Sequence, residues 1–221
     1  MDASAFLVFG GILKWIGLAA LPIFALPLAI LVLPRPFAGI GARVSGWIDR
    51  LTGGALSAAI AAALILIFAQ LAVVIMRYAF SLSFTWLNEI VMYAFAAMFM
   101  LGSAAALRDD AHVRVDILRP RFGTIGRNWI ELAGIYLFLF PICVRILTTG
   151  EQGLARAWFL FEGSRESDGL PLMFLFKTLV PAFALLMLAQ GLSQAVKAAR
   201  RLTGDLPDDA TKGEIGGSNG A

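Results

Sequence analysis

Many of the residue types that could do chemistry in this sequence lie in two short polar clusters. The first cluster contains Arg77 and Tyr78, followed after a short gap by residues 84–89. Thr85 is able to cap the N-terminus of a helix, and Glu89 would then lie near the positive end of the helix dipole. Glu89 is also placed to pair with Arg77 or with a partner chain. Because the cluster borders an apolar segment, we favour a structural ion pair.

The second cluster covers residues 107–116. Within it His112, Arg114 and Asp116 alternate with Val113 and Val115, which is the pattern of a short extended segment with one polar face. The simpler interpretation is a charged loop solvated by water. Both interpretations place the cluster in a connection that follows an apolar segment.

The sequence does not indicate an enzyme or a metal site. The phosphate-binding pattern G-x-x-x-x-G-K-[ST] is missing. Metal sites need several His, Cys or acidic ligands, whereas His112 is the one histidine and Cys143 the one cysteine. A haem with two axial histidines from this chain is therefore excluded. We predict no enzymatic activity, no metal and no cofactor.

The composition is typical of a membrane protein. Hydrophobic residues make up 59% of the 221 residues and charged residues only 15%, whereas soluble domains carry about a quarter charged residues. A helix that crosses the hydrocarbon core needs about 20 mainly apolar residues. Four segments meet this need, at 55–76, 90–107, 130–149 and 178–196. The predicted fold class is all-α, a polytopic membrane helix bundle with four core transmembrane helices.

A fifth apolar segment, residues 16–33, is interrupted by Pro22 and Pro27. Proline removes a helix hydrogen bond and kinks the axis. The segment is therefore predicted to be an N-terminal helix that either spans the membrane with a kink or is embedded in it. Its start lacks a basic cluster, which favours a retained anchor helix over a cleaved signal peptide.

Basic residues predict the orientation of the bundle, because Lys and Arg concentrate in cytoplasmic loops. They are frequent in residues 34–54, in residues 108–127 and in the C-terminal tail. The loops at 78–86 and 150–169 hold fewer unopposed bases. We expect a bacterial inner-membrane protein whose C-terminus is cytoplasmic. The net charge of +3 does not indicate nucleic-acid binding, because the bases lie beside apolar spans.

Three regions are predicted along the chain. Residues 1–54 form an anchor helix and an amphipathic interfacial linker, residues 55–198 form a four-helix membrane domain, and residues 199–221 form a disordered cytoplasmic tail. The linker would place one apolar face toward the membrane while Asp49 points away; that face contains Ile40, Val44, Trp47, Ile48 and Leu51.

Small residues at helical spacing predict close helix packing; they are Gly54, Ala58, Ala62, Gly102 and Ala106. Alanine-rich membrane sequence without any specific contact is the alternative explanation. Few polar side chains lie within the spans, and this favours a packing role over a translocating one.

The order of these motifs resembles the small permease subunit of TRAP (tripartite ATP-independent periplasmic) transporters, DctQ-like in type. The resemblance covers roughly residues 55–198. Within the family, the sequence is most similar to the larger subgroup of mannitol or chloroaromatic type. Asn88 stands where many members have an acid. The matching residues are Trp86, Asn88, Glu89, Gly102, Leu107, Arg108, His112, Arg114, Val115 and Asp116.

The resemblance implies secondary active uptake by three partners. A periplasmic solute-binding protein would deliver the solute, a large membrane subunit would move it, and this chain would pack against and stabilise the large subunit. Eight residues would then contact the large subunit or form a structural charge network: Arg77, Trp86, Asn88, Glu89, Arg108, His112, Arg114 and Asp116.

Two other functions remain open from the residues alone. One is a stand-alone oligomeric channel or carrier, which would need a polar path built from several copies. The other is a membrane anchor for an enzyme complex, which would need an extramembrane partner.

Overall fold

A computed structural model describes residues 24–109 and 123–206, together with the backbone but not the side chains of residues 34–36. Residues 16–23 of the predicted first segment, the polar residues His112, Arg114 and Asp116, and most of the predicted tail lie outside the described residues. The described part of the first segment, residues 24–32, is helical.

The predicted all-α class is confirmed, because the described residues contain helices and no strand. After residues 24–32 the order is α2 (Pro34–Phe80), α3 (Thr85–Arg108), α4 (Gly123–Gly134), the π-helical turn η2 (Ile135–Leu139), α5 (Phe140–Phe159) and α6 (Met173–Leu202). Four helices in the described residues are long and apolar enough to cross a membrane: Phe37–Phe80, Thr85–Arg108, Gly123–Phe159 and Met173–Leu202.

Helix α2 joins the predicted linker and the predicted second span without a break. Its 47 residues correspond to about 70 Å at the usual rise of an α-helix. Asp49 was predicted to point away from the apolar face of this helix, and its carboxylate is bonded to side chains of α6. The predicted apolar face is divided: Ile48 is buried, whereas Trp47 is exposed.

The third long helix is continuous from α4 through η2 to α5, and it contains Pro141. Proline has no backbone N–H and clashes with the carbonyl one turn earlier, which breaks the regular hydrogen-bond pattern. The π-helical turn Ile135–Leu139 comes just before this proline. Local π-helical adjustment is one way in which a membrane helix accommodates a proline.

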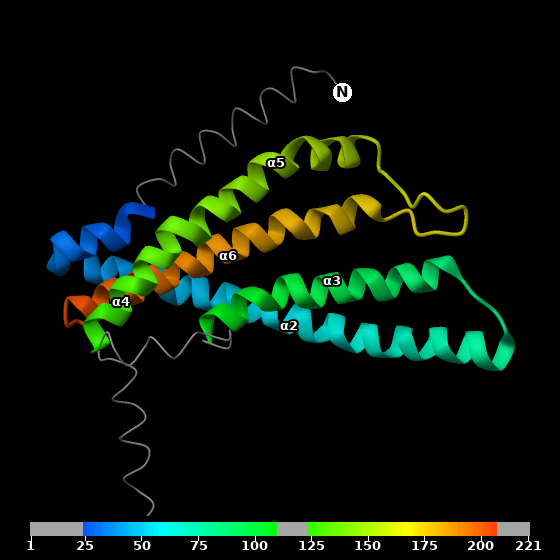
Figure 1. The fold of residues 1–221 in the computed structure, drawn as a ribbon, viewed down its shortest axis with the longest axis horizontal. Helices are drawn as coiled ribbons and strands as arrows, with labels where there is room; N and C mark the ends of the chain where they lie inside the picture. Colours follow the sequence, from blue (N-terminus) through cyan, green and yellow to red (C-terminus); the bar gives the residue numbers. More distant parts are fainter. Residues whose placement is uncertain (1–23, 110–122, 207–221) are drawn as a thin grey trace, which may run out of the picture.

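Helix α6 is central to the bundle, where it lies between α5 and the α2–α3 pair (Figure 1). It also contacts α4 and η2. Its C-terminal half is rich in small residues that are fully buried, and these let neighbouring helices approach closely; they include Gly191, Ala195, Ala198 and Ala199. Residues 24–32 pack against this half of α6 through Leu26 and Ile30.

The predicted packing residues differ in their surroundings. In the α2–α3 pair, a Cβ atom added at Gly102 would lie 3.7 Å from the Cβ of Ala59, an ordinary van der Waals contact. Ala62 is buried, whereas Gly54 and Ala58 are exposed. Ala106 is half-buried near the end of α3.

Candidate functional site

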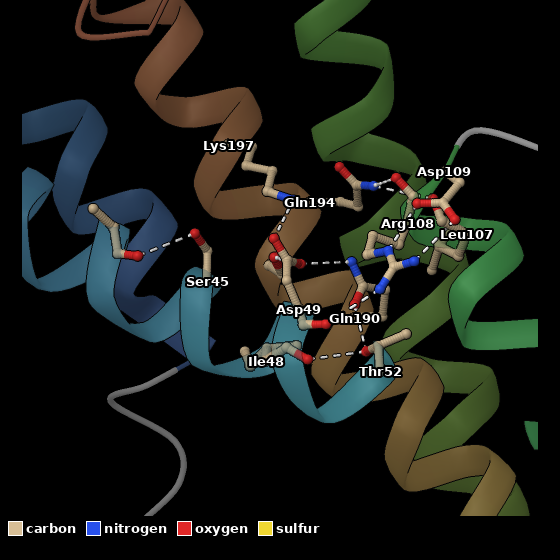
Figure 2. Close-up of polar contacts among 12 residues, drawn as sticks. Ser45, Ile48, Asp49, Thr52, Leu107, Arg108, Asp109, Gln190, Gln194 and Lys197 are labelled. Atoms are coloured by element: carbon tan, nitrogen blue, oxygen red, sulfur yellow. Dashed lines mark hydrogen bonds and ion pairs between the residues drawn. The ribbon is translucent and has the colours of Figure 1, made fainter. Parts of the chain in front are cut away.

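One group of polar side chains joins α2 to α6. Asp49 Oδ1 accepts hydrogen bonds from Gln190 Nε2 at 3.2 Å and from Ser193 Oγ at 2.9 Å, and Asp49 Oδ2 pairs with Lys197 Nζ at 2.8 Å. One turn along α2, Thr52 Oγ1 donates to Gln190 Oε1 at 2.7 Å. We call these five residues the Asp49 cluster (Figure 2).

The sequence of α6 explains how these groups meet. Ser193 and Gln194 follow Gln190 by three and four residues, and Lys197 follows them by four and three, so all four share one face. That face is turned toward α2 and α3, where Gln190 and Ser193 have no exposed surface. Buried polar groups are costly unless they are hydrogen-bonded. Each α6 residue of this face has such a partner.

The end of α3 is bound to the same face of α6. Gln194 Nε2 donates to the carbonyl oxygens of Leu107 at 3.0 Å and Arg108 at 3.1 Å. Carbonyls in the last turn of a helix have no partner within the helix, so Gln194 caps α3 from outside. Arg108 Nη1 in turn donates to the carbonyl oxygen of Asp49 at 3.2 Å (Figure 2).

Arg108 also stabilises the charge that follows α3. Its Nε lies 2.7 Å from Asp109 Oδ1. This hydrogen bond lowers the pKa of Asp109 below its ordinary value, and the positive charge of Arg108 adds to the effect. The Asp49 cluster and its neighbours therefore connect three helices whose contacting residues are far apart in the sequence.

A second polar group lies at the opposite end of α3. Glu89 Oε1 accepts a hydrogen bond from Ser164 Oγ, and Glu89 Oε2 accepts one from the backbone N–H of Leu170 at 2.6 Å. The backbone N–H of Thr85 donates to Asp168 Oδ2 at 3.4 Å. These contacts hold the loop between α5 and α6 over the start of α3. We call these five residues the Glu89 clasp.

The clasp leaves little free space around Gly169. A Cβ atom at this position would overlap Ser164 Oγ and would lie 2.9 Å from Glu89 Oε1. Such separations are far inside van der Waals contact, so a larger residue would displace Ser164 or Glu89.

Beside the clasp, Lys177 Nζ pairs with Glu162 Oε2 at 2.5 Å. The hydrogen bond from Lys177 lowers the pKa of Glu162 below its ordinary value of 4.5.

Two details predicted for this end differ from the structure. Thr85 begins α3 and provides no side-chain cap; its backbone N–H is bonded to the loop residue Asp168. The expected ion pair between Glu89 and Arg77 does not form within the described part of the chain, where Arg77 is exposed. Because the loop supplies an N–H and a hydroxyl donor, the carboxylate is satisfied without a cation.

The remaining predicted site residues are dispersed. Trp86 and Asn88 lie at the surface of the first turns of α3, where Asn88 Nδ2 donates to the carbonyl oxygen of Phe84 at 2.9 Å. His112, Arg114 and Asp116 fall outside the described residues. The structure brings Arg108 to the Asp49 cluster and Glu89 to the loop before α6. Their contact with a partner subunit stays a prediction.

Sequence reasoning missed the Asp49 cluster. The available signal was the polar spacing Gln190, Ser193, Gln194 and Lys197 on a helix that is otherwise apolar and small. No group of His, Cys, Asp or Glu able to hold a metal ion occurs among the described residues. The polar groups described above connect α2 and α3 to α6, and α3 to the loop before α6.

A comparison with protein families identifies the chain. Residues 65–201, more than half of its length, match the family model described as tripartite ATP-independent periplasmic transporters, DctQ component. The chain belongs to this family. No curated protein and no solved structure matches it.

The DctQ component is the small membrane subunit of a TRAP transporter, and this chain is thus a multi-pass membrane protein of a solute uptake system. Such systems also contain a large membrane subunit and a periplasmic binding protein. The family is one of transporter subunits and is not a known enzyme family. The match contains the whole Glu89 clasp, whereas Asp49 and Thr52 precede it.

Proposed function

We propose that this DctQ component acts as a fixed scaffold, which packs against its large subunit and carries no solute itself. The observation that supports this role is the contrast between its polar and apolar surfaces. Asp49 and Glu89 are bonded to groups of the same chain. The outward faces of the spans are apolar, with Phe68 and Phe99 more than 60% exposed.

The large apolar surface needs a cover of lipid or protein. In each apolar window of the four spans, no more than 22% of the residues are buried within the chain. In lipid, association of helices depends on van der Waals packing and on interhelical hydrogen bonds. The surface is suited to a membrane partner on one side and to lipid on the other, which agrees with a role beside the large subunit.

We further propose that the C-terminus is cytoplasmic and the Glu89 clasp periplasmic. Lys197, Arg200 and Arg201 near the end of α6 support this orientation, as do Arg43 and Arg50 on α2. The clasp would then order a loop on the side where the binding protein arrives. A reporter that is active only in the cytoplasm should be active when fused after Leu202. Activity of a periplasm-specific reporter fused at the same position would contradict this orientation.

The finer family assignment and the division of the chain are also proposals. The helical stretch before residue 55 supports the larger subgroup of mannitol or chloroaromatic type. Residues 1–54 would add an anchor and an interfacial segment to a membrane domain at 55–198, followed by a tail at 199–221. Deleting residues 1–54 should leave a membrane-inserted remainder, which a protease-protection assay would detect.

Co-purification in mild detergent tests the scaffold role. The chain is expressed with the large subunit encoded beside it, and a stoichiometric complex is expected. Glu89→Ala should weaken assembly or uptake without changing the affinity of the binding protein for its solute. Glu151→Ala is the matched control, because it removes an exposed carboxylate of α5 that lies outside the clasp.

Normal assembly and uptake in Glu89→Ala would remove the clasp from the functional residues. Two results would contradict the scaffold role itself. One is solute flux through liposomes that contain this chain alone, which would establish a stand-alone carrier. The other is co-purification with a soluble enzyme in place of the large subunit.

A further inference from the structure

The first third of α2 exposes a stripe of basic and apolar side chains. Ile40, Arg43, Trp47, Arg50 and Leu51 follow one another at helical spacing and fall within an arc of about 100° around the helix. All five are exposed, with exposed fractions of 50% for Ile40, 65% for Trp47 and 45% for Leu51. We call these residues the Arg43–Arg50 stripe.

The stripe is divided along its length. With 100° per residue, Arg43 and Arg50 lie at one edge, Ile40 and Leu51 at the other, and Trp47 between them. One edge of the stripe is therefore basic and the other apolar, along about three turns of helix. Such a division fits a boundary between a charged layer and an apolar one.

The two arginines differ from three other bases at this end of the molecule. Lys197, Arg108 and Arg200 are each paired with a carboxylate of the same chain. By contrast, Arg43 and Arg50 make no hydrogen bond or ion pair within the described residues. Their guanidinium groups are free to bind an external anion.

The length of α2 places the stripe at a membrane surface. Trp47 and Tyr78 are 31 residues apart on this helix, which corresponds to about 46 Å. A bilayer with its headgroups is about 40–45 Å thick. A modestly tilted α2 therefore brings Tyr78, which is 82% exposed, to one surface and Trp47 to the other. Trp and Tyr are enriched at both interfaces.

We propose that the Arg43–Arg50 stripe binds the headgroup of an anionic phospholipid. The two guanidinium groups bind the phosphate through paired N–H donors. Trp47 lies at the level of the ester groups, and Ile40 and Leu51 contact the upper acyl chains. An anionic lipid fits better than a carboxylate of a protein, because one ligand matches both the basic edge and the apolar edge. The site belongs to the isolated chain and does not depend on the scaffold role.

Native mass spectrometry of the full chain in detergent tests the proposal, with phosphatidylglycerol and phosphatidylcholine titrated separately. The wild-type chain should retain phosphatidylglycerol preferentially. Each arginine near the membrane surface contributes about 5-fold in affinity for anionic lipid, so Arg43→Gln with Arg50→Gln should reduce phosphatidylglycerol binding by about 30-fold. Phosphatidylcholine binding should change little.

The matched control is Arg156→Gln with Arg165→Gln, which removes the same charge from exposed positions at the other end of the molecule. It should keep the preference for phosphatidylglycerol. Equal losses in both double variants, or an unchanged preference in the Arg43 and Arg50 variant, would overturn the proposal. So would a variant that loses the large subunit while still selecting phosphatidylglycerol, because the arginines would then serve a protein contact.

Discussion

The Asp49 cluster and the Glu89 clasp each place a carboxylate among hydrogen-bond donors, but they join different kinds of element. Asp49 connects helix to helix, with donors from α6 that lie 141 to 148 residues away in the sequence. Glu89 connects a helix to a loop, and one of its donors is the backbone N–H of Leu170. The first arrangement fixes the register of packed helices, and the second orders a connection.

The difference follows from what each region would otherwise lack. Lipid provides little hydrophobic drive for helices to associate, so polar contacts and close packing determine how they fit together. A loop at the membrane surface has backbone N–H groups that need acceptors. A carboxylate with two oxygens is able to accept hydrogen bonds from such a loop. The Asp49 cluster should thus influence global unfolding, whereas the Glu89 clasp should influence local opening.

The largest expected effect is on global stability. Asp49→Ala removes the acceptor of three α6 side chains and leaves Lys197 without its counter-charge. Breaking a fully buried pair costs about 3–5 kcal/mol; because the Asp49 side chain is 28% exposed, we expect about 2–3 kcal/mol. Unfolding in detergent with increasing dodecyl sulfate measures this change.

Asp109→Ala is the control for that measurement. Its carboxylate is 54% exposed and pairs with the adjacent Arg108, so the free energy of unfolding should change by less than about 1 kcal/mol. Similar losses in the two variants would show that the Asp49 cluster has no special role in stability.

A smaller and local effect is expected at the clasp. Gly169→Ala inserts a methyl group where Ser164 and Glu89 already lie, so the hydrogen bonds of Glu89 should break. Loss of such a bond is worth about 1 kcal/mol, and amide exchange at Leu170 should rise about 5-fold while global stability changes little. Gly102→Ala is the control, because its methyl group would make an ordinary contact with Ala59. Equal exchange at Leu170 in Gly169→Ala and wild type would exclude the clasp as the source of loop order.

A comparable local effect is expected where the Asp49 cluster meets α3. Gln194→Leu keeps the size of the side chain but removes both hydrogen bonds to the last carbonyls of α3. The end of α3 should fray, with exchange of the amides at residues 105–109 accelerated by roughly 3- to 10-fold. Hydrogen exchange read by mass spectrometry locates the change. Fraying throughout α6 instead would mean that Gln194 supports its own helix.

The smallest expected effect is a pH dependence beside the clasp. Because Lys177 lowers the pKa of Glu162 below 4.5, this pair stabilises the loop above pH 4.5. Its contribution is lost as the pH falls from 4.5 through the lower pKa of the folded state. Protease cleavage in residues 160–172 should increase over that range in the wild type. Glu162→Gln should show no such increase, and an identical pH profile in both would assign the effect to another group.

Much of the fold was readable from the sequence, but the contacts of the polar groups were not. The segments 55–76, 90–107, 130–149 and 178–196 all lie within helices of the structure, because an apolar run of this length has one stable form in lipid. Asp49 was predicted to lie away from the apolar face of its helix, but its partners on α6 were not predicted. In the structure Trp47 faces outward, whereas the carboxylate of Asp49 is bonded within the protein.

The clasp was predictable only in part. The residues near Glu89 predicted the start of a helix, but no contact was predicted for the loop before α6. Nothing in the sequence spacing linked these two regions, which are about 80 residues apart. Their contact depends on how α3, α5 and α6 pack together.

The sequence by itself determined that this protein is a membrane helix bundle with four long spans, and its motifs indicated the family. Both conclusions rest on local properties, since apolar length and residue order do not require knowledge of distant contacts. Only the tertiary structure decided that Asp49 bonds to α6, that Gln194 caps α3 and that Glu89 holds the loop before α6. Hydrogen bonds require donor and acceptor within about 3 Å, and helix packing alone brings such distant residues that close.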